Sequence, residues 1–498
     1  MASSSSSFFF AEPTPTDNNG SSSSSSAPAS SSPSSSPITN MAPDHLFTVL
    51  LLLPVESILS FAATCKRFRS LATSDTLWES VCTREFGASS VDALRSSLLP
   101  NLRNVAAKPW MAMYRKVSRL DTVSCSRLLP DPDAAELGGI PSPRASHSLN
   151  FISDCLVLFG GGCEGGRHLD ETWIAYVGSN SQTMIKWQKV STGIPSGRFG
   201  HTCVAIGNYV ILFGGINDRG VRHNDTWVGR VLSTENNVGG GGITLSWRLL
   251  DLDLGSSRAP PPRGAHAACC FERKMVIQGG IGLYGLRLGD TWVLEPAEDF
   301  CSGTWRELLT YPAPPPRSGH SLSCIGGTKM VLFGGRGLGY EAMDDLWLLQ
   351  ISESGDLMWV QVVYENQKVP EGVSLRRVGH SATPILGGRL LIHGGEDSLR
   401  HRKDDFLILD IEAVLPIREQ LPPPALNTRR LQQASSSLWK RINVKGHKPN
   451  RRSFHRACGD QSGRYLYLYG GMVDGLLQPG EAAGLRFDGE LFVVELFQ

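Results

Sequence analysis

The chain has 498 residues and a formal net charge of +1 at pH 7. This length predicts two or three domains or one large repeat array, and the near-neutral charge gives no general attraction to nucleic acid or to anionic membranes. The longest apolar run, Val49 to Leu53, is far shorter than the roughly 20 residues of a membrane-spanning helix. We therefore expect neither nucleic acid nor a membrane as a partner.

The eleven cysteines are scattered, odd in number and without a C-x-x-C pair. An odd number would leave one thiol unpaired in a secreted protein. The N-terminus has no basic segment ahead of its short apolar cluster Phe8 to Phe10, which is unlike a secretory signal. We expect reduced cysteines and a location in the nucleus, the cytoplasm or both.

Residues 1–40 are mostly Ser, Pro, Ala and Thr. Such a segment cannot bury enough apolar surface to offset the entropy of ordering it, so the composition predicts a disordered tail. It is either an inert tether or a phosphorylation-controlled segment, and the tether is the simpler interpretation.

Residues 41–84 change to an apolar pattern with helical spacing. The first helix should end at Pro54, a second should run from Ile58 to Leu71, and a third should carry Leu77, Trp78, Val81 and Cys82. So small a unit buries too little surface to be self-sufficient, so part of its apolar face should dock on another molecule. Residues 85–121 continue as a helical connector, in which Trp110, Met113, Tyr114 and Val117 form one apolar stripe.

From residue 143 onward one pattern recurs six times: Arg-x-x-His, an apolar run ending in two glycines, an acidic residue two before an aromatic or apolar residue, and in most units a further tryptophan. The Arg and His positions are Arg144/His147, Arg198/His201, Arg263/His266, Arg317/His320, Arg377/His380 and Arg452/His455. The acidic positions are Glu171, Asp225, Asp290, Asp345, Asp405 and Glu490. Self-similarity at this period indicates a propeller or another array.

The repeats resemble kelch repeats, and six units predict a six-bladed β-propeller over residues 122–498, with blades starting near 143, 197, 262, 316, 376 and 451. Each tryptophan should pack between neighbouring sheets, and each Arg and acidic pair should form a charge-assisted hydrogen bond. One histidine per unit at one register indicates a structural role. The last unit lacks an outer strand, so residues 122–129, with Cys125 in the tryptophan position, should supply it and close the ring.

The loops between the second and third strands form the mouth of the expected propeller, and function often lies on loops held by a rigid scaffold. They carry the candidate partner-binding residues Arg167, Arg222, Arg287, Arg336, Arg402 and Arg486. A ring of cations would suit an acidic or phosphorylated protein segment, and ordinary solvated surface is the alternative. Insertions at 412–436 and at Gly239 to Gly242 should lie between third and fourth strands, on the opposite face.

No motif for catalysis, for a cofactor or for a metal stands out. Iron-dependent plant kelch proteins carry a Glu-x-x-x-Asp-x-x-x-His run, whereas here Glu341 and Asp345 are followed by Leu349. We therefore expect no enzyme activity, no cofactor and no metal, and a kelch-type metalloenzyme is kept as a remote alternative.

The segment LLLLPVESILSFAATCKRFRSLATSDTLW resembles an F-box, although Ala42-Pro43 replaces the usual opening Leu-Pro and Phe68 replaces a tryptophan. The resemblance implies contacts to a Skp-type adaptor. The implied adaptor-binding residues are Leu50, Leu53, Pro54, Ile58, Leu59, Cys65, Phe68, Leu77 and Trp78.

An F-box followed by kelch repeats is similar to the plant F-box/kelch proteins, and the segments RRVGHSATPILGGRLLIHGGEDSLRHRKDDF and SFHRACGDQSGRYLYLYGGMVDGLLQPGEAAGLRFDGELF resemble the ADAGIO/ZEITLUPE group. That group usually has a LOV light-sensor domain ahead of the F-box. No LOV-type cysteine motif occurs here, so we do not expect light sensing. The resemblance implies a substrate-recognition subunit of a Skp-cullin-F-box (SCF) ubiquitin ligase, linked through the adaptor to cullin and RING subunits. A non-ligase scaffold is the alternative, and the sequence does not identify the substrate protein.

Overall fold

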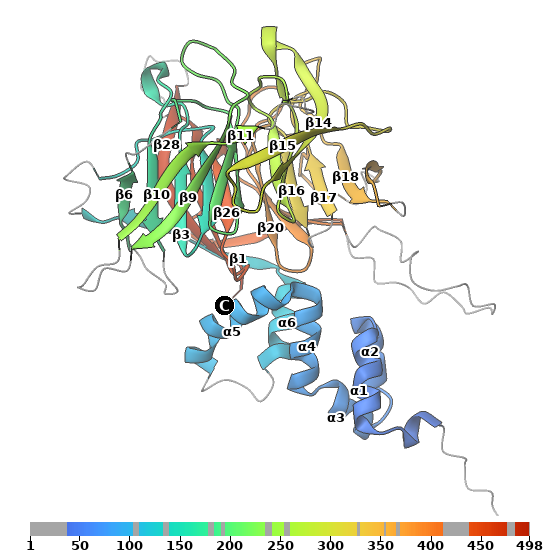
Figure 1. Cartoon of the computed structure of the whole chain (residues 1–498). Helices are drawn as coiled ribbons and strands as arrows, with labels where there is room; N and C mark the ends of the chain where they lie inside the picture. The colour runs from blue at the N-terminus through green and yellow to red at the C-terminus, as the bar shows by residue number, and fades with distance from the viewer. Residues whose placement is uncertain are drawn as a thin grey trace, which may run out of the picture.

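The structure is a computed structural model that describes residues 37–102, 109–132, 139–177, 184–190, 195–234, 242–252, 259–325, 329–352, 355–364, 369–411, 438–475 and 484–497. It consists of an N-terminal group of helices and a β-propeller (Figure 1), as the sequence predicts. Residues 1–36 of the expected tail and the insertion at 412–436 lie outside the described residues. Pro37–Asn40, at the end of that tail, forms the short 3-10 helix η1.

Six α-helices precede the sheets. They are α1 (Pro43–Leu52), α2 (Val55–Ala62), α3 (Lys66–Ala72), α4 (Asp75–Phe86), α5 (Ala88–Leu102) and α6 (Pro109–Arg119). The single helix expected from Ile58 to Leu71 is wrong, because α2 ends at Ala62 and α3 begins after Cys65. The backbone of Cys65 is extended, and its sulfur accepts a hydrogen bond from the Phe68 amide (3.5 Å), which caps α3. We refer to α1–α4 as the helical domain.

Helix α6 joins the helical domain to the propeller. Its Met111 packs in the apolar core of the helical domain, whereas Val117 packs with Leu386 of the propeller. The buried Arg389, in the fifth sheet, donates hydrogen bonds from Nη2 to the Val117 carbonyl (2.6 Å) and from Nη1 to the Ser118 carbonyl (3.4 Å). A cation at the C-terminal end of a helix satisfies its last carbonyls and complements its dipole.

The described strands form six sheets. Each sheet is given from its inner to its outer strand. The first contains β2 (Ser148–Ile152), β3 (Cys155–Phe159), β4 (Thr172–Tyr176) and β6 (Trp187–Val190), and the second contains β7 (Thr202–Ile206), β8 (Tyr209–Phe213), β9 (Thr226–Thr234) and β10 (Gly242–Leu249). The third contains β12 (Ala267–Phe271), β13 (Lys274–Ile281), β14 (Arg287–Pro296), β15 (Ser302–Leu308) and β11 (Asp251–Leu252), and the fourth contains β16 (Ser321–Ile325), β17 (Lys329–Phe333), β18 (Leu346–Ile351) and β19 (Leu357–Val362).

The fifth sheet contains β20 (Ser381–Ile385), β21 (Arg389–His393), β22 (Phe406–Asp410) and β23 (Trp439–Arg441). The sixth contains β26 (Arg456–Gly459), β27 (Tyr465–Asp474), β28 (Leu485–Glu495) and β1 (Thr122–Pro130), with β25 (Arg452–Ser453) on β27 and both β24 (Asn443–Gly446) and β5 (Met184–Ile185) on β1. Neighbouring inner strands contact one another all the way around, from β2 through β7, β12, β16 and β20 to β26 and back to β2.

The expected pairing of Arg with an acidic residue occurs within the first five sheets. In the fourth, the fully buried Arg317 contacts Asp345 with Nη2 (2.6 Å) and donates from Nη1 to the Gly334 carbonyl (3.0 Å). Trp347 donates its Nε1 hydrogen to the same carboxylate (2.7 Å). Gly334 has φ +66°, and a Cβ atom there would lie 2.8 Å from the Arg377 carbonyl of the next sheet, so the tight turn requires glycine.

The sixth sheet departs from this rule. Arg452 pairs mainly with Asp488 (Nη1 to Oδ1, 3.5 Å), and the expected partner Glu490 lies farther away, at 4.0 Å from Nη2. The third sheet has the same register shift, with Leu288 opposite Gly280, so the difference comes from the residue itself: in the sixth sheet this position is Asp488, opposite Gly471. The expectation that Glu490 takes the repeat's acidic role is therefore wrong.

The outer tryptophans connect neighbouring sheets, as predicted. Trp359 donates from Nε1 to Thr291 Oγ1 of the third sheet (3.1 Å), and Trp305 does the same to Thr226 of the second. Strand β1 completes the sixth sheet by antiparallel pairing with β28. Cys125 lies opposite Val494, two residues after Phe492, just as Trp359 lies opposite Leu349, two residues after Trp347. Strand β1 therefore stands next to β28, in the position expected for residues 122–129.

The strand-one histidines bridge neighbouring sheets. In four places the histidine Nε2 forms a hydrogen bond with a hydroxyl on the preceding inner strand: His201 with Ser148, His266 with Thr202, His380 with Ser321 and His455 with Ser381. The residue at this register before His320 is Ala267. Accordingly, His320 Nε2 is buried with no hydrogen-bond partner among the described residues.

The substitution Ala267→Ser should therefore stabilise the protein. A serine hydroxyl at this register would complete one more pair with His320, which is worth about 0.5–1.5 kcal/mol in the free energy of unfolding. Chemical denaturation of the purified full chain measures it. The mirror variant Ser321→Ala, which removes the hydroxyl paired with His380, should lose a similar amount, and no gain from Ala267→Ser would contradict the role of these pairs.

Candidate protein-interaction surfaces

The helical domain places the implied adaptor-binding residues in two environments. Five of the nine are buried in its core or among its helices, namely Leu50, Ile58, Phe68, Leu77 and Trp78. In this structure these five hold the helices together: Trp78, for example, donates its Nε1 hydrogen to the Ala72 carbonyl (2.9 Å). Their contact with an adaptor stays a prediction. Leu53 is half-buried against the same core, and Pro54, Leu59 and Cys65 are exposed.

Exposed apolar side chains lie on α1 and α2. Leu52 is 81 % exposed, Leu59 43 % and Val49 41 %. Sequence reasoning missed Val49 and Leu52. The signal was the unbroken run from Val49 to Leu53, because one face of a helix cannot bury five consecutive apolar residues. Large apolar groups gathered on the surface of a small domain mark an interaction site, which we call the α1–α2 face.

At the other end of the molecule, the six candidate arginines occupy different registers of their loops. Arg222, Arg287 and Arg402 each pair across their loop with the residue that follows the double glycine, and Arg336 is itself such a residue. These arginines therefore stand at different registers of their loops, and their contact with a partner stays a prediction. Arg167 and Arg486 are exposed, each one residue before this paired position.

Two of the arginines are engaged inside the protein. Arg336 Nη2 lies 3.2 Å from Glu396 Oε1, and Arg402 Nη1 lies 2.6 Å from Asp474 Oδ1. Glu396 is buried and also accepts a hydrogen bond from Ser453 Oγ (3.1 Å). Because their charge is already compensated, Arg336 and Arg402 order the mouth and are poor candidates for capturing an acidic partner. The loop spacing in the sequence gave no sign of this Glu396-centred network.

The mouth also carries exposed apolar side chains, which sequence reasoning missed. Tyr284 and Leu286 of the third sheet, Leu338 and Tyr340 of the fourth and Leu399 of the fifth are each more than half exposed. The guanidinium of Arg287 stacks 4.4 Å from the ring centre of Tyr340, which links two neighbouring loops. The signal was the presence of Leu and Tyr in loops that are otherwise Gly-rich. We call these five residues the apolar rim.

The α1–α2 face and the apolar rim lie at separate ends of the molecule. Helix α6 packs against the loop between the first and second strands of the fifth sheet, where Leu386 and Arg389 lie. The rim lies on loops between second and third strands, at the opposite end of those strands (Figure 1). Within the described residues, no group of three or more His, Cys, Asp or Glu side chains is placed to hold a metal ion. None of the described helices has the length and apolarity needed to cross a bilayer.

Comparison with known proteins adds family evidence. Residues 43–84 match the model described as F-box-like, and residues 114–239 and 243–415 match the model of the KLHDC2/KLHL20/DRC7 Kelch-repeats domain. An F-box/kelch-repeat protein of Arabidopsis thaliana is 57 % identical over 465 residues, which is 93 % of this chain and 93 % of that protein.

More distant relatives are Adagio proteins. Adagio protein 3 of Arabidopsis thaliana is 27 % identical over 85 % of this chain, and Adagio-like protein 1 of Oryza sativa subsp. japonica is 26 % identical over 82 %. The chain spans 60 % and 59 % of the lengths of these two proteins.

Proposed function

The chain belongs to the F-box/kelch-repeat proteins, and from this premise we propose that it is the substrate-recognition subunit of an SCF-type ubiquitin ligase. Its F-box would dock a Skp-type adaptor and, through it, a cullin and a RING subunit. Its six sheets would act as one six-bladed kelch propeller that binds the protein to be ubiquitinated. The site of action would be the nucleus, the cytoplasm or both.

The observation that carries this proposal is that two exposed apolar surfaces lie at separate ends of the molecule and are connected through helix α6. The α1–α2 face lies on the F-box, and the apolar rim lies at the far mouth of the propeller. Helix α6, held by Arg389, fixes one relative to the other. Such a protein needs no chemistry of its own, because holding a substrate lysine near a charged enzyme raises its effective concentration.

The composition of the apolar rim describes the partner. Tyr and Arg are enriched at the energetic centres of protein interfaces, and the rim combines Tyr284, Tyr340 and the stacked Arg287 with exposed leucines. We propose that it takes an apolar segment of the substrate protein, with exposed Arg167 and Arg486 nearby to favour acidic flanks. An acidic partner would therefore bind only those arginines of the mouth whose charge is not compensated within the protein.

The substitution Leu52→Asp should abolish capture of a Skp-type adaptor by the full chain. Leu52 is 81 % exposed, so the change costs little folding stability, while a buried charge at the interface should weaken adaptor binding at least about tenfold. Leu338→Asp on the apolar rim is the matched control. It should retain the adaptor and lose proteins captured by the propeller. Adaptor binding that is equal in the wild type and in Leu52→Asp, or absent in both, would refute the proposed F-box surface.

The remaining alternatives have their own tests. A non-ligase scaffold would bind the adaptor without a cullin, so cullin co-purification with the wild type separates it from a ligase subunit. A kelch-type metalloenzyme would contain stoichiometric metal after purification, which elemental analysis measures. The substrate would be found among proteins that accumulate when this chain is lost and that Leu338→Asp fails to restore to normal levels.

A further inference from the structure

At one position of the inner strands, the sixth sheet carries a different type of residue from the other five. The residue after each strand-one histidine is small in five sheets and a long cation in the sixth. These residues are Ser148, Thr202, Ala267, Ser321, Ser381 and Arg456. The small residues fit the crowded axis, and four of them form a hydrogen bond with the next histidine. Arg456 offers His147 no such partner, and both ring nitrogens of His147 lack a hydrogen bond among the described residues.

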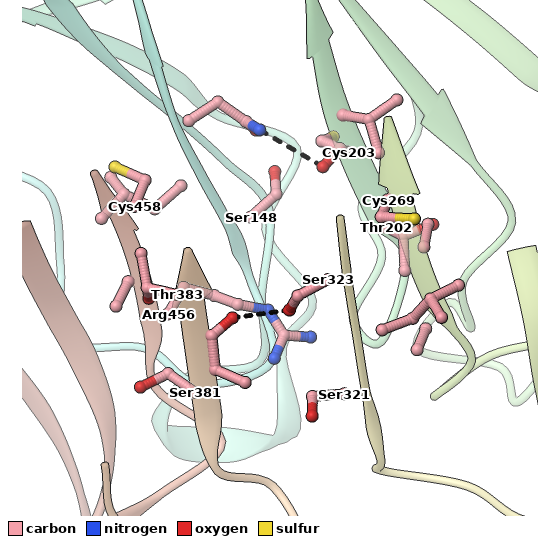
Figure 2. Close-up of a pocket in the computed structure, with 18 of the residues that line it drawn as sticks. Ser148, Thr202, Cys203, Cys269, Ser321, Ser323, Ser381, Thr383, Arg456 and Cys458 are labelled. Atoms are coloured by element: carbon pink, nitrogen blue, oxygen red, sulfur yellow. Dashed lines mark hydrogen bonds between the residues drawn. The ribbon is translucent and has the colours of Figure 1, made fainter. Parts of the chain in front are cut away.

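Arg456 projects into the central cavity. This cavity has a volume of about 410 Å³ and is lined by the inner strands of all six sheets. Figure 2 shows the Arg456 side chain entering it together with serine and threonine hydroxyls. Its Nε donates to the His147 carbonyl (2.9 Å), which fixes the side chain and leaves the outer edge of the guanidinium toward the cavity.

The protein supplies no counter-charge for Arg456. Among the described residues that line the cavity there is no Asp or Glu. Burial lowers the pKa of Arg456, and among the described residues the Cys203 thiol opposes this effect. The charge of Arg456 in turn helps to lower the pKa of His147, His201 and His266, so its electrostatic effect extends to three other sheets around the axis. Arg456 is half-buried, and a cation that is partly removed from water without a charged partner costs folding free energy.

The entrance at the mouth end is narrow. Six residues just before the strand-one histidines form a closed ring of backbone N–H to carbonyl hydrogen bonds of 2.6–2.9 Å around the axis. They are Ser146, Gly200, Ala265, Gly319, Gly379 and Phe454. All have positive φ, and Phe454 is the one with a bulky side chain, whose ring lies over Gly379. The cavity below this ring is therefore shielded from the protein that the apolar rim would bind.

We propose that the central cavity is a binding site for a small phosphate-bearing anion, held by the Arg456 guanidinium. The planar fork of a guanidinium matches two phosphate oxygens. The hydroxyl of Thr383, which lines the same cavity, supplies a further donor. The anion would neutralise the half-buried cation and tie the sixth sheet to its neighbours. This inference rests on the fold and is independent of the proposed ligase role.

The test compares thermal unfolding of the full chain in sodium phosphate and in sodium chloride at matched ionic strength. Phosphate should raise the wild-type Tm above its value in chloride. Arg456→Ser, which carries the residue found at this position in three other sheets, should lose this difference and bind phosphate at least tenfold more weakly by calorimetry. Arg456→Lys keeps the charge without the fork and should show a reduced difference.

Arg451→Ser is the matched control, because Arg451 is an exposed arginine just before β25 in the same sheet and does not line the cavity. It should respond to phosphate as the wild type does. The proposal is overturned if the wild type shows no phosphate-specific shift, if Arg456→Ser keeps it, or if Arg451→Ser abolishes it. A parallel series with glycerol 2-phosphate assigns the site to phosphate esters when the shift is equal or larger, and to the free anion when inorganic phosphate alone acts.

Discussion

Lowering the pH from 7.5 to 5.5 should sharply destabilise this protein. Burial, together with neighbouring positive charge in each case, lowers the pKa of the six strand-one histidines well below the usual range. In the unfolded chain the same side chains titrate near about 6.5. The six histidines thus contribute stability that is fully present above this value and is lost as the pH falls toward the folded-state pKa, because only the unfolded state takes up protons.

Each such histidine changes the free energy of unfolding by about 1.4 kcal/mol per pH unit below the unfolded pKa. Six acting together give a slope on the order of 8 kcal/mol per pH unit, which is comparable to the whole stability of a typical domain. Denaturant unfolding at pH 7.5, 6.5 and 5.5 measures the slope. A flat profile over this range would show that the histidines accept protons in the folded state.

His320→Gln is the sharpest single-site check. Both ring nitrogens of His320 lack a hydrogen bond among the described residues, so replacement removes the titrating group at little cost in hydrogen bonding. The variant should take up one proton fewer on unfolding at pH 5.5, which reduces the slope by about 1.4 kcal/mol per pH unit. An unchanged slope would assign the acid sensitivity to other groups.

The repeated unit was readable from the sequence because each of its features answers a separate steric or electrostatic demand. The turn needs a positive φ at Gly334 and Gly335, which glycine adopts without strain, and the acidic residue neutralises the buried Arg317. Such demands recur identically in each sheet, so one sequence displays them several times. The same reasoning placed Cys125 on a tryptophan register, although cysteine has none of tryptophan's bulk.

The features that the sequence did not reveal lie at positions whose residue type the repeat does not constrain. The neutralisation of Arg336 by Glu396 joins two loops that are 60 residues apart in the sequence, so no local pattern predicts it. In the F-box, motif matching pointed to Ile58 and Trp78, which build the domain, and passed over Leu52, which faces outward. The role of Arg456 could not be predicted from the residue alone, because it depends on the small residues that occupy its register in the other five sheets.

Deleting residues 1–130 should largely abolish folding of the propeller. The deletion removes β1, whose residues Ser124 to Leu128 pair with β28, and exposes the apolar side of the sixth sheet that Val123, Cys125 and Leu128 cover. Burial of these three side chains alone is worth about 5 kcal/mol or more, which is a large fraction of the stability of a domain. The freed edge of β28 would also offer unpaired backbone groups for aggregation.

The matched control is deletion of residues 1–107, which removes the F-box and keeps α6 and β1. Helix α6 retains its contacts through Val117 and Arg389, so this variant should remain folded, with a Tm within a few degrees of the full chain. The variant without β1 should be insoluble or unfold at a far lower temperature. Because both variants lack the F-box, the difference between them measures the joint contribution of α6 and β1, and equal thermal stability of the two would show that the propeller holds together without its N-terminal strand.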